Sequence, residues 1–370
     1  MRALSPLSTS VAIAVITAWL SACAGTSEDG PTILAGADRT TGAAQSGSSD
    51  SRLGAIYDEG SLLLPYRAPP SGGVAYRLTL EIEGERAARS PYNAKQPPVR
   101  EAHSLLVEFR KLPVEAADSK DDMFLVGLDG LLYTQKQQNP QIERVVELAE
   151  DRLRIKVNGE TSVDNRGNRV VGKLAPRAFL NRIFGVFTHD PSGNPIKLSS
   201  RGTPAAREFM NSIPILGAIA YTMVTLPEDP ITPGSKWFGV RLPSSRSGEL
   251  GLSLTIDYTL EGFEIFEDVP CAIIQLNAHI DEYAFTGITG LKFDKVQATL
   301  NGTAWVELEN SLVRRVVLSD QIRATWTSPG DPKTASEHRI QHTSKLELTL
   351  RDPKRKTKKW SNGTPRFESN

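Results

Sequence analysis

Hydrophobic and polar residues alternate along most of the chain. The clearest alternation lies in residues 76–83, 152–157, 252–260, 272–280 and 340–350. A period of two places successive side chains on opposite faces of a β-strand, and this is typical of strands with one buried and one solvated face. Sheets built from such strands are usually antiparallel. The sequence therefore predicts a mainly β protein.

The predicted strands are long and are separated by short turn signals. Several strands reach ten residues, and residues 312–326 form a longer, less regular stripe. Asp129-Gly130, Asn158-Gly159 and Glu309-Asn310-Ser311 have the residue types of hairpin turns. Sheet twist accumulates as such a meander widens. We therefore expect a long-stranded antiparallel sheet curled as a half-barrel.

A few segments have a different pattern and predict short helices. Pro140–Asp151 carries apolar residues at helical spacing, and 177–187 is a weaker case of the same pattern. Thr203-Pro204 has the residue types of a helix start. Ile213–Leu226 is an apolar stretch of 14 residues, too short to span a bilayer. We expect this stretch to be a buried helix or linker that lies against the sheet.

Proline and glycine residues between 227 and 234 divide the β region into two halves that show some internal similarity. The strand at 77–84 resembles the one at 253–262, because both end in Glu-Gly. Asn158-Gly159 is matched by Asn301-Gly302. Duplication of one β unit is one interpretation. Chance similarity between amphipathic strands is the other, because the spacing of the landmarks differs.

The first residues resemble a bacterial lipoprotein signal. Arg2 is followed by an apolar run at 11–20 and then by Leu20-Ser21-Ala22-Cys23. The run is too short to span a bilayer and has the length of a signal peptide core. The resemblance implies cleavage before Cys23 and acylation of its sulfur, with palmitate among the usual chains. An ordinary secretory signal cut near Ala22 or Ala24 and an uncleaved anchor are the alternatives.

The lipoprotein interpretation also predicts the location of the protein. A diacylated cysteine is a durable membrane anchor, because two acyl chains bind a membrane stably whereas a single chain binds only marginally. Ala24 is not the aspartate that retains enteric lipoproteins in the inner membrane, so the resemblance implies the outer membrane, facing the periplasm. The division of the chain is then 1–22 signal peptide, 23–73 lipidated Cys23 and flexible linker, 74–200 N-terminal β-rich half, 201–226 helical or apolar connector, 227–352 C-terminal β-rich half, and 353–370 basic disordered tail.

Composition excludes some partners. The chain has 43 Lys and Arg against 43 Asp and Glu, and so lacks the basic field that general nucleic-acid binding requires. Cys271 has no possible disulfide partner once Cys23 is acylated, so we expect a buried structural thiol. The basic run at 354–360 either forms a solvated tail or contacts anionic headgroups.

A second resemblance covers about residues 220–330. Residues 226–237 (LPEDPITPGSKW) are followed by Tyr258-Thr259-Leu260-Glu261-Gly262 and then by Cys271-Ala272-Ile273-Ile274. This order is similar to a family of uncharacterised bacterial envelope lipoproteins, which implies no activity. In physical terms, Pro233-Gly234 predicts a tight turn, and Trp237 is expected to anchor the next strand in the core.

No residues form a recognisable catalytic, metal or cofactor motif. His338 and His342 share a strand face without a third ligand nearby, so we expect them to face solvent or an ordinary partner. His279 with Asp281 and Glu282, and His189 with Asp190, are interpreted as solvated polar groups. No nucleophile-elbow, zinc-protease or phosphate-loop motif occurs. A hydrolase on the β scaffold is a remote option, and we expect no enzyme.

The sequence thus favours a membrane-anchored, non-enzymatic lipoprotein that binds a hydrophobic or amphipathic molecule, such as a lipid, or an envelope protein partner. That step is an analogy at the level of the fold. The alternative is a structural or assembly-partner protein with a closed core and no small ligand. The residues expected to line a ligand site are Leu254, Ile256, Leu276, Val316, Leu318, Trp326 and Leu346.

Overall fold

A computed structural model describes the β region of the chain and the helix inside it. The described residues are 61–67, 69–70, 72–89, 97–114, 122–149, 152–166, 183–189, 192–193, 195–200, 213, 215–241, 250–285, 292–327 and 337–351. Cys23, the helix start at Thr203-Pro204, the connector up to residue 212 and the basic run at 354–360 lie outside them.

Nearly all of the described chain belongs to one antiparallel sheet of 14 strands. The N-terminal strands are β1 (Val74–Arg89), β2 (Val99–Pro113), β3 (Asp122–Gln138), β4 (Ile142–Ala149), β5 (Arg152–Val157), β6 (Glu160–Arg166), β7 (Ile183–His189) and β8 (Pro195–Ser200). After helix α5 (Ile215–Tyr221) come β9 (Lys236–Arg241), β10 (Leu250–Phe266), β11 (Val269–Phe285), β12 (Lys292–Glu307), β13 (Val313–Thr327) and β14 (Glu337–Leu350).

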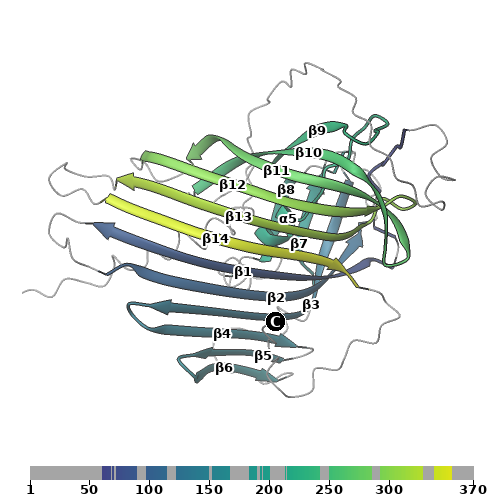
Figure 1. The fold of residues 1–370 in the computed structure, drawn as a ribbon. Helices are drawn as coiled ribbons and strands as arrows, with labels where there is room; N and C mark the ends of the chain where they lie inside the picture. The colour runs from purple at the N-terminus through teal and green to yellow at the C-terminus, as the bar shows by residue number, and fades with distance from the viewer. Residues whose placement is uncertain are drawn as a thin grey trace, which may run out of the picture.

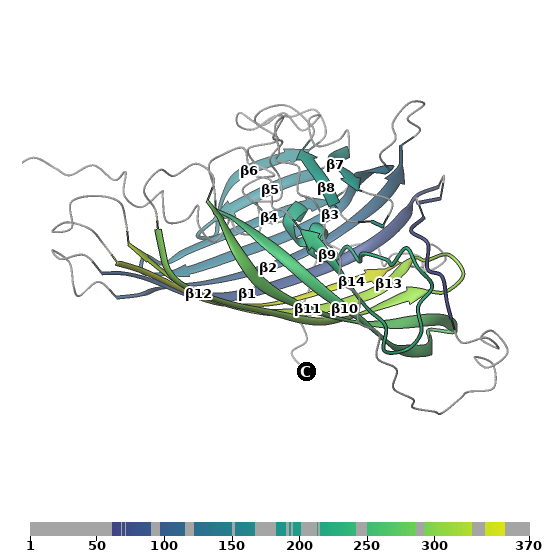
Figure 2. The same ribbon diagram turned by 90° about the horizontal axis from the view of Figure 1, so that it is seen from above.

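The sheet is open and curls into a trough (Figures 1 and 2). Its strand order is β6-β5-β4-β3-β2-β1-β14-β13-β12-β11-β10-β9, with β7 and β8 paired on β3 away from this path. Figure 2 shows α5 on the concave side of the curve. The prediction of a mainly β protein with a long-stranded antiparallel half-barrel is confirmed.

The strands that come first and last in the sequence, β1 and β14, pair with each other and join the two halves in one sheet. β1 pairs with β14 along nearly its whole length, from Tyr76 opposite Leu350 to Arg89 opposite Glu337. Duplication was suggested in part by the match of Asn158-Gly159 with Asn301-Gly302. Asn158 and Gly159 form a turn with positive φ angles of 50° and 83°. Asn301 and Gly302 instead lie in the middle of β12. This pair therefore gives no support to duplication.

Local turn and helix signals were right at some positions and wrong at others. The turns at Asn158-Gly159 and 309–311 are confirmed, since they join β5 to β6 and β12 to β13. The predicted turn at Asp129-Gly130 is wrong. Both residues lie inside β3, beside a register shift where β2 pairs with it. A bulge accommodates the same residue types as a turn, because both need local freedom of the backbone.

The helix predicted at 140–151 is also wrong, because this segment forms β4. Only Val146 of the strand is buried, so the helical spacing of its apolar residues does not correspond to a core-facing stripe. The weaker helix prediction at 177–187 fails where the structure describes it, since residues 183–189 form β7. The stretch at 213–226 does contain a buried helix, α5, as predicted.

Part of the segment expected to be a flexible linker packs on the sheet. Leu62 and Ile231 form an isolated antiparallel bridge, with both N···O distances at 2.7 Å. Leu64 is completely buried in the core. Leu62 and Leu64 therefore belong to the folded body.

Gly302 lies in the middle of a strand, at a point where the neighbouring strand comes too close for any side chain. A Cβ atom built on it would lie 2.3 Å from both the Val317 carbonyl oxygen and Leu318 Cδ2. We expect Gly302→Ala to reduce the free energy of unfolding by about 2 kcal/mol, because overpacking shifts the neighbouring strand. Gly262→Ala is the matched control, since nothing lies within 4 Å of its Cβ position. Urea denaturation of both variants measures the difference, and equal stabilities would contradict the expectation.

Candidate functional site

The two faces of the sheet differ in chemistry. On β1, Tyr76, Leu78 and Leu80 point to the concave side and are buried. Their neighbours Arg77 and Glu81 alternate with them and are exposed. The same alternation continues along β14 and β13. The trough is therefore apolar on the inside and polar on the outside, and its concave face is where a ligand site can form.

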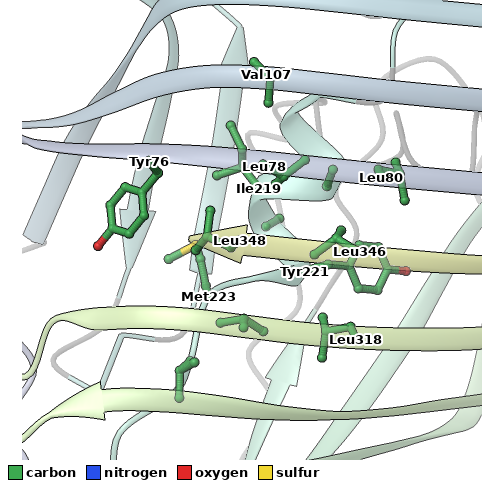
Figure 3. Close-up of a cluster of buried hydrophobic side chains, with 14 of the residues drawn as sticks. Tyr76, Leu78, Leu80, Val107, Ile219, Tyr221, Met223, Leu318, Leu346 and Leu348 are labelled. Carbon is green, nitrogen blue, oxygen red and sulfur yellow. The ribbon is translucent and has the colours of Figure 1, made fainter. Parts of the chain in front are cut away.

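The concave face has a floor of aliphatic side chains that α5 covers. We define the α5 segment as Ile213 and residues 215–226. Figure 3 shows Ile219, Tyr221 and Met223 of this segment lying over side chains from four neighbouring strands. Those floor residues, all buried, are Leu78, Leu80, Val107, Leu318, Leu346 and Leu348.

The C-terminal end of the α5 segment is held by hydrogen bonds. Leu226 N donates to the Ser192 carbonyl at 2.8 Å. Trp237 Nε1 donates to the Thr225 carbonyl, also at 2.8 Å. The Trp237 ring stacks on Tyr258 with a centroid separation of 5.6 Å. Trp237 therefore anchors β9 to the core as predicted, and Gly234 occupies the preceding turn with a φ of 90°.

The residues expected to line a ligand site belong to this apolar interior. Ile256, Leu276, Val316, Leu318 and Leu346 are all buried members of one hydrophobic cluster. Leu318 and Leu346 lie next to the α5 segment (Figure 3). Leu254 and Trp326 are in β10 and β13, but their side chains lie outside the described part. The α5 segment thus packs against two of the residues that were expected to line a ligand site.

A second group of concave-face residues is polar. We call it the polar cluster and define it as Arg86, Glu101, His103, Tyr133, Asp320 and His342. Gly84 of β1 is opposite Glu101 on one side and opposite His342 on the other. Ile82 is opposite His103 and Ser344, and Ser344 is opposite Asp320. The cluster therefore crosses five adjacent strands, from β3 to β13, toward the end of the trough where β1 ends.

Charged and aromatic groups of the cluster contact one another. Arg86 Nη2 lies 3.0 Å from Glu101 Oε1, in an ion pair whose side chains are 11% and 2% exposed. Glu101 Oε2 lies 3.5 Å from His103 Nε2. His103 Nδ1 and the Tyr133 hydroxyl are hydrogen-bonded at 2.9 Å. The chain Arg86–Glu101–His103–Tyr133 is thus an inward-facing polar network on an otherwise apolar surface.

Burial shifts the pKa values of Asp320 and His342, which lie on the other side of the cluster. Desolvation raises the pKa of Asp320 to about 6, although hydrogen bonds from Ser344 oppose this rise. Desolvation and the nearby His103 lower the pKa of His342 to about 4. His342 is therefore neutral at physiological pH, and Asp320 is a carboxylate that costs free energy to ionise.

Sequence reasoning missed most of this cluster. His342 was expected to face solvent or an ordinary partner, but it is buried. The available signal was that Glu101 and His103 continue the inward stripe of Leu105, Val107 and Phe109. Asp320 likewise interrupts the inward stripe of β13. A polar residue inside a buried stripe is more informative than an exposed one.

Other candidate groups are structural where the structure describes them. Cys271 is buried, as expected, and desolvation raises the pKa of its thiol to about 11. The interpretation of His189 as a solvated group is wrong, because His189 is buried against Tyr66 and Phe124. Asp190 and the side chains of His279, Asp281 and Glu282 lie outside the described part. Among the described residues, no three or more His, Cys, Asp or Glu side chains are grouped so as to hold a metal ion. Within the same residues, no helix is both long and apolar enough to cross a membrane.

No family model and no curated protein sequence matches the chain. Several solved structures are similar to it. Lipovitellin, from a structure concerned with lipid–protein interactions, is 9% identical over 77% of this chain with a TM-score of 0.41. A β-barrel-like protein of a domain of unknown function from Brucella abortus is 7% identical, with coverages of 75% of this chain and 98% of that one and a TM-score of 0.18. OccK5 (OpdH) from Pseudomonas aeruginosa is 8% identical, with coverages of 74% and 98% and a TM-score of 0.20. This chain spans only 26% of the lipovitellin chain.

Proposed function

We propose that this protein is a non-enzymatic lipoprotein of the bacterial envelope that binds an amphipathic molecule, such as a lipid, on the concave face of its sheet. The observation that carries the proposal is the division of that face into an aliphatic floor and a buried polar cluster. An amphiphile has the same division, with an apolar chain and a polar headgroup. Its chain would lie along the floor, where the α5 segment now packs, and its headgroup would lie toward the polar cluster.

The buried polar atoms favour a ligand over a purely structural interior. Arg86 Nη1, His103 Nε2 and Asp320 Oδ1 are buried and have no hydrogen-bond partner in the part of the chain that is described. Leaving such an atom without a hydrogen bond costs about 1–3 kcal/mol. Buried polar atoms of this kind are uncommon in native proteins. A headgroup would supply the missing hydrogen bonds.

The α5 segment is the observation that favours the second candidate, a structural or assembly-partner protein with a closed core. Its side chains already cover the floor, and the described floor residues are buried without any ligand. On this alternative the α5 segment is a permanent part of the core. On the first proposal an amphiphile displaces it; the hydrogen bonds that join Leu226 to Ser192 and Thr225 to Trp237 lie at its C-terminal end.

The test is native mass spectrometry of the full chain purified from membranes, followed by extraction of bound lipids. We expect an amphiphile bound at about one molecule per chain. Absence of any co-purifying small molecule, together with failure to bind added fatty acid, would leave the closed-core alternative. Leu346→Asp places a charge on the floor and should abolish ligand binding. Lys345→Asp makes the corresponding change on the outer face and should not affect binding.

The lipoprotein part of the proposal depends on Cys23 and has its own prediction. Cys23→Ser removes the only thiol that can take the diacylglycerol, so the variant should not incorporate radiolabelled palmitate and should move from the membrane to the soluble fraction. Cys271→Ser is the control and should incorporate the label normally. Membrane partitioning of Cys23→Ser equal to that of the wild type would contradict lipid anchoring. That result would not bear on the proposal of ligand binding in the trough.

A further inference from the structure

We infer that the polar cluster is a binding site for a hydroxyl-rich headgroup, so that the amphiphile is of the glycolipid class. This inference rests on the proposed function and adds the chemistry of the ligand.

The cluster lies near an accessible end of the trough. The Glu101 and His103 side chains are 2% and 5% exposed, so both are desolvated. Arg86 is only three residues from the end of β1 at Arg89, and both Ala88 and Arg89 are exposed. A headgroup could therefore reach the cluster from the end of the strands without crossing the apolar floor.

The atoms without partners include both donors and acceptors. Within the described residues, Arg86 Nη1 is a donor and Asp320 Oδ1 is an acceptor, and neither has a hydrogen-bond partner. His103 Nε2 also lacks one, and it donates or accepts according to its tautomer. A hydroxyl group donates one hydrogen bond and accepts others, so a set of hydroxyls satisfies all three atoms.

Charge argues against an ionic headgroup. Arg86 and Glu101 form an ion pair, and Asp320 supplies a further carboxylate. An anionic headgroup placed against Arg86 would also approach the Glu101 carboxylate, which lies 3.0 Å from Arg86. A cationic headgroup placed against Glu101 would lie beside the desolvated Arg86 guanidinium, and like charges at such a site repel strongly. Neutral hydroxyls avoid both costs.

The dimensions of the cluster fit an extended headgroup. From Tyr133 on β3 to Asp320 on β13 it crosses four strand spacings, or about 19 Å at the usual separation of paired strands. Gly84 lies between Glu101 and His342 and contributes no side chain there. A Cβ atom at Gly84 would lie 3.1 Å from His342 Cβ. The row is wider than one sugar ring, so more than one sugar could contact it.

The experiment compares two amphiphiles with the same chain and different headgroups. The full chain in phosphatidylcholine nanodiscs is titrated calorimetrically with hexyl maltoside and with hexylphosphocholine, below the concentrations at which they form micelles. Empty nanodiscs supply the blank. We expect the maltoside to bind at least about tenfold more tightly, since one or two hydrogen bonds to charged groups are worth that factor.

Variants of the cluster provide a second readout. Glu101→Gln and Asp320→Asn keep the size of the side chain and should each weaken maltoside binding roughly tenfold. Neither should weaken the binding of hexylphosphocholine, because the loss of a carboxylate removes repulsion of its phosphate. Glu83→Gln is the matched control, because Glu83 is exposed on the outer side of the same strand as Arg86. Circular dichroism identifies any variant that does not fold, and the selectivity of the wild type then still decides the question.

The outcomes separate the inference from the proposed function. Tight, selective maltoside binding that the cluster variants weaken supports both. Equal binding of the two amphiphiles, unchanged in the cluster variants, overturns the glycolipid inference and leaves amphiphile binding in place. Failure of both amphiphiles to bind overturns the proposed function as well.

Discussion

Asp320→Asn and His342→Gln should change the pH dependence of stability in opposite directions. Both residues are buried in the polar cluster, and burial disfavours the charged form of each. The folded protein therefore holds Asp320 protonated, and His342 neutral, over a wider pH range than the unfolded chain does. A difference in pKa between the two states makes stability depend on pH.

For His342 the folded pKa is about 4, against an ordinary value of 6.5. Its contribution to stability is complete above pH 6.5 and is lost as the pH falls through 4. For Asp320 the folded pKa is about 6, against 3.8. Its contribution is complete below pH 3.8 and is lost as the pH rises through 6. Each shift corresponds to about 3 kcal/mol, so the two nearly cancel in the wild type between pH 4 and 6.

Each single variant should expose the remaining group. In Asp320→Asn the free energy of unfolding, relative to wild type, should fall by about 3 kcal/mol from pH 6 to pH 4. In His342→Gln it should rise by about the same amount over that interval. Urea denaturation at a series of pH values measures both differences. The double variant is the control and should run parallel to the wild type. Parallel profiles for all four proteins would show that neither side chain is desolvated in the fold.

Ile219→Ala should reduce the free energy of unfolding by about 3 kcal/mol. Ile219 is completely buried between α5 and the floor of the trough, and removing buried methylene groups costs the transfer free energy plus the cavity that remains. Phe238→Ala is the control. Its side chain is 55% exposed on β9, and changes at such positions usually stay within about 0.5 kcal/mol.

Equilibrium denaturation of the full chain measures both variants. Equal stability of the two would contradict tight packing of the α5 segment on the sheet. A large cost for Ile219→Ala alone would show that an amphiphile must replace buried contacts when it displaces this segment.

The fold could be predicted because strand alternation is a local signal. The inward stripe of β1 follows from its own sequence, and so does the turn at Pro233-Gly234 that precedes Trp237. The helix predicted at 140–151 was wrong. Val145 and Val146 are β-branched and favour a strand. What decides the structure of this segment is the pairing of β4 with β3, and the local pattern of apolar residues does not show that pairing.

The polar cluster could not be predicted because it depends on register between distant strands. Glu101 and His342 lie on either side of Gly84 only because β1 pairs with both β2 and β14. Each residue alone shows only a polar group at an inward position of its own strand, without its partners. The desolvation that shifts the pKa of Asp320 and of His342 arises only when the sheet curls and its concave face is covered.

Photolabelling tests most directly whether the concave face holds an amphiphile. The full chain in phosphatidylcholine vesicles is irradiated with a diazirine-bearing fatty acid, and the modified residues are identified by tandem mass spectrometry, with excess oleate as competitor. We expect competed labels on inward residues such as Leu80 and Leu346 and on the α5 segment. Labels confined to outward residues such as Glu81 and Lys345, or labels that oleate does not compete, would contradict binding in the trough.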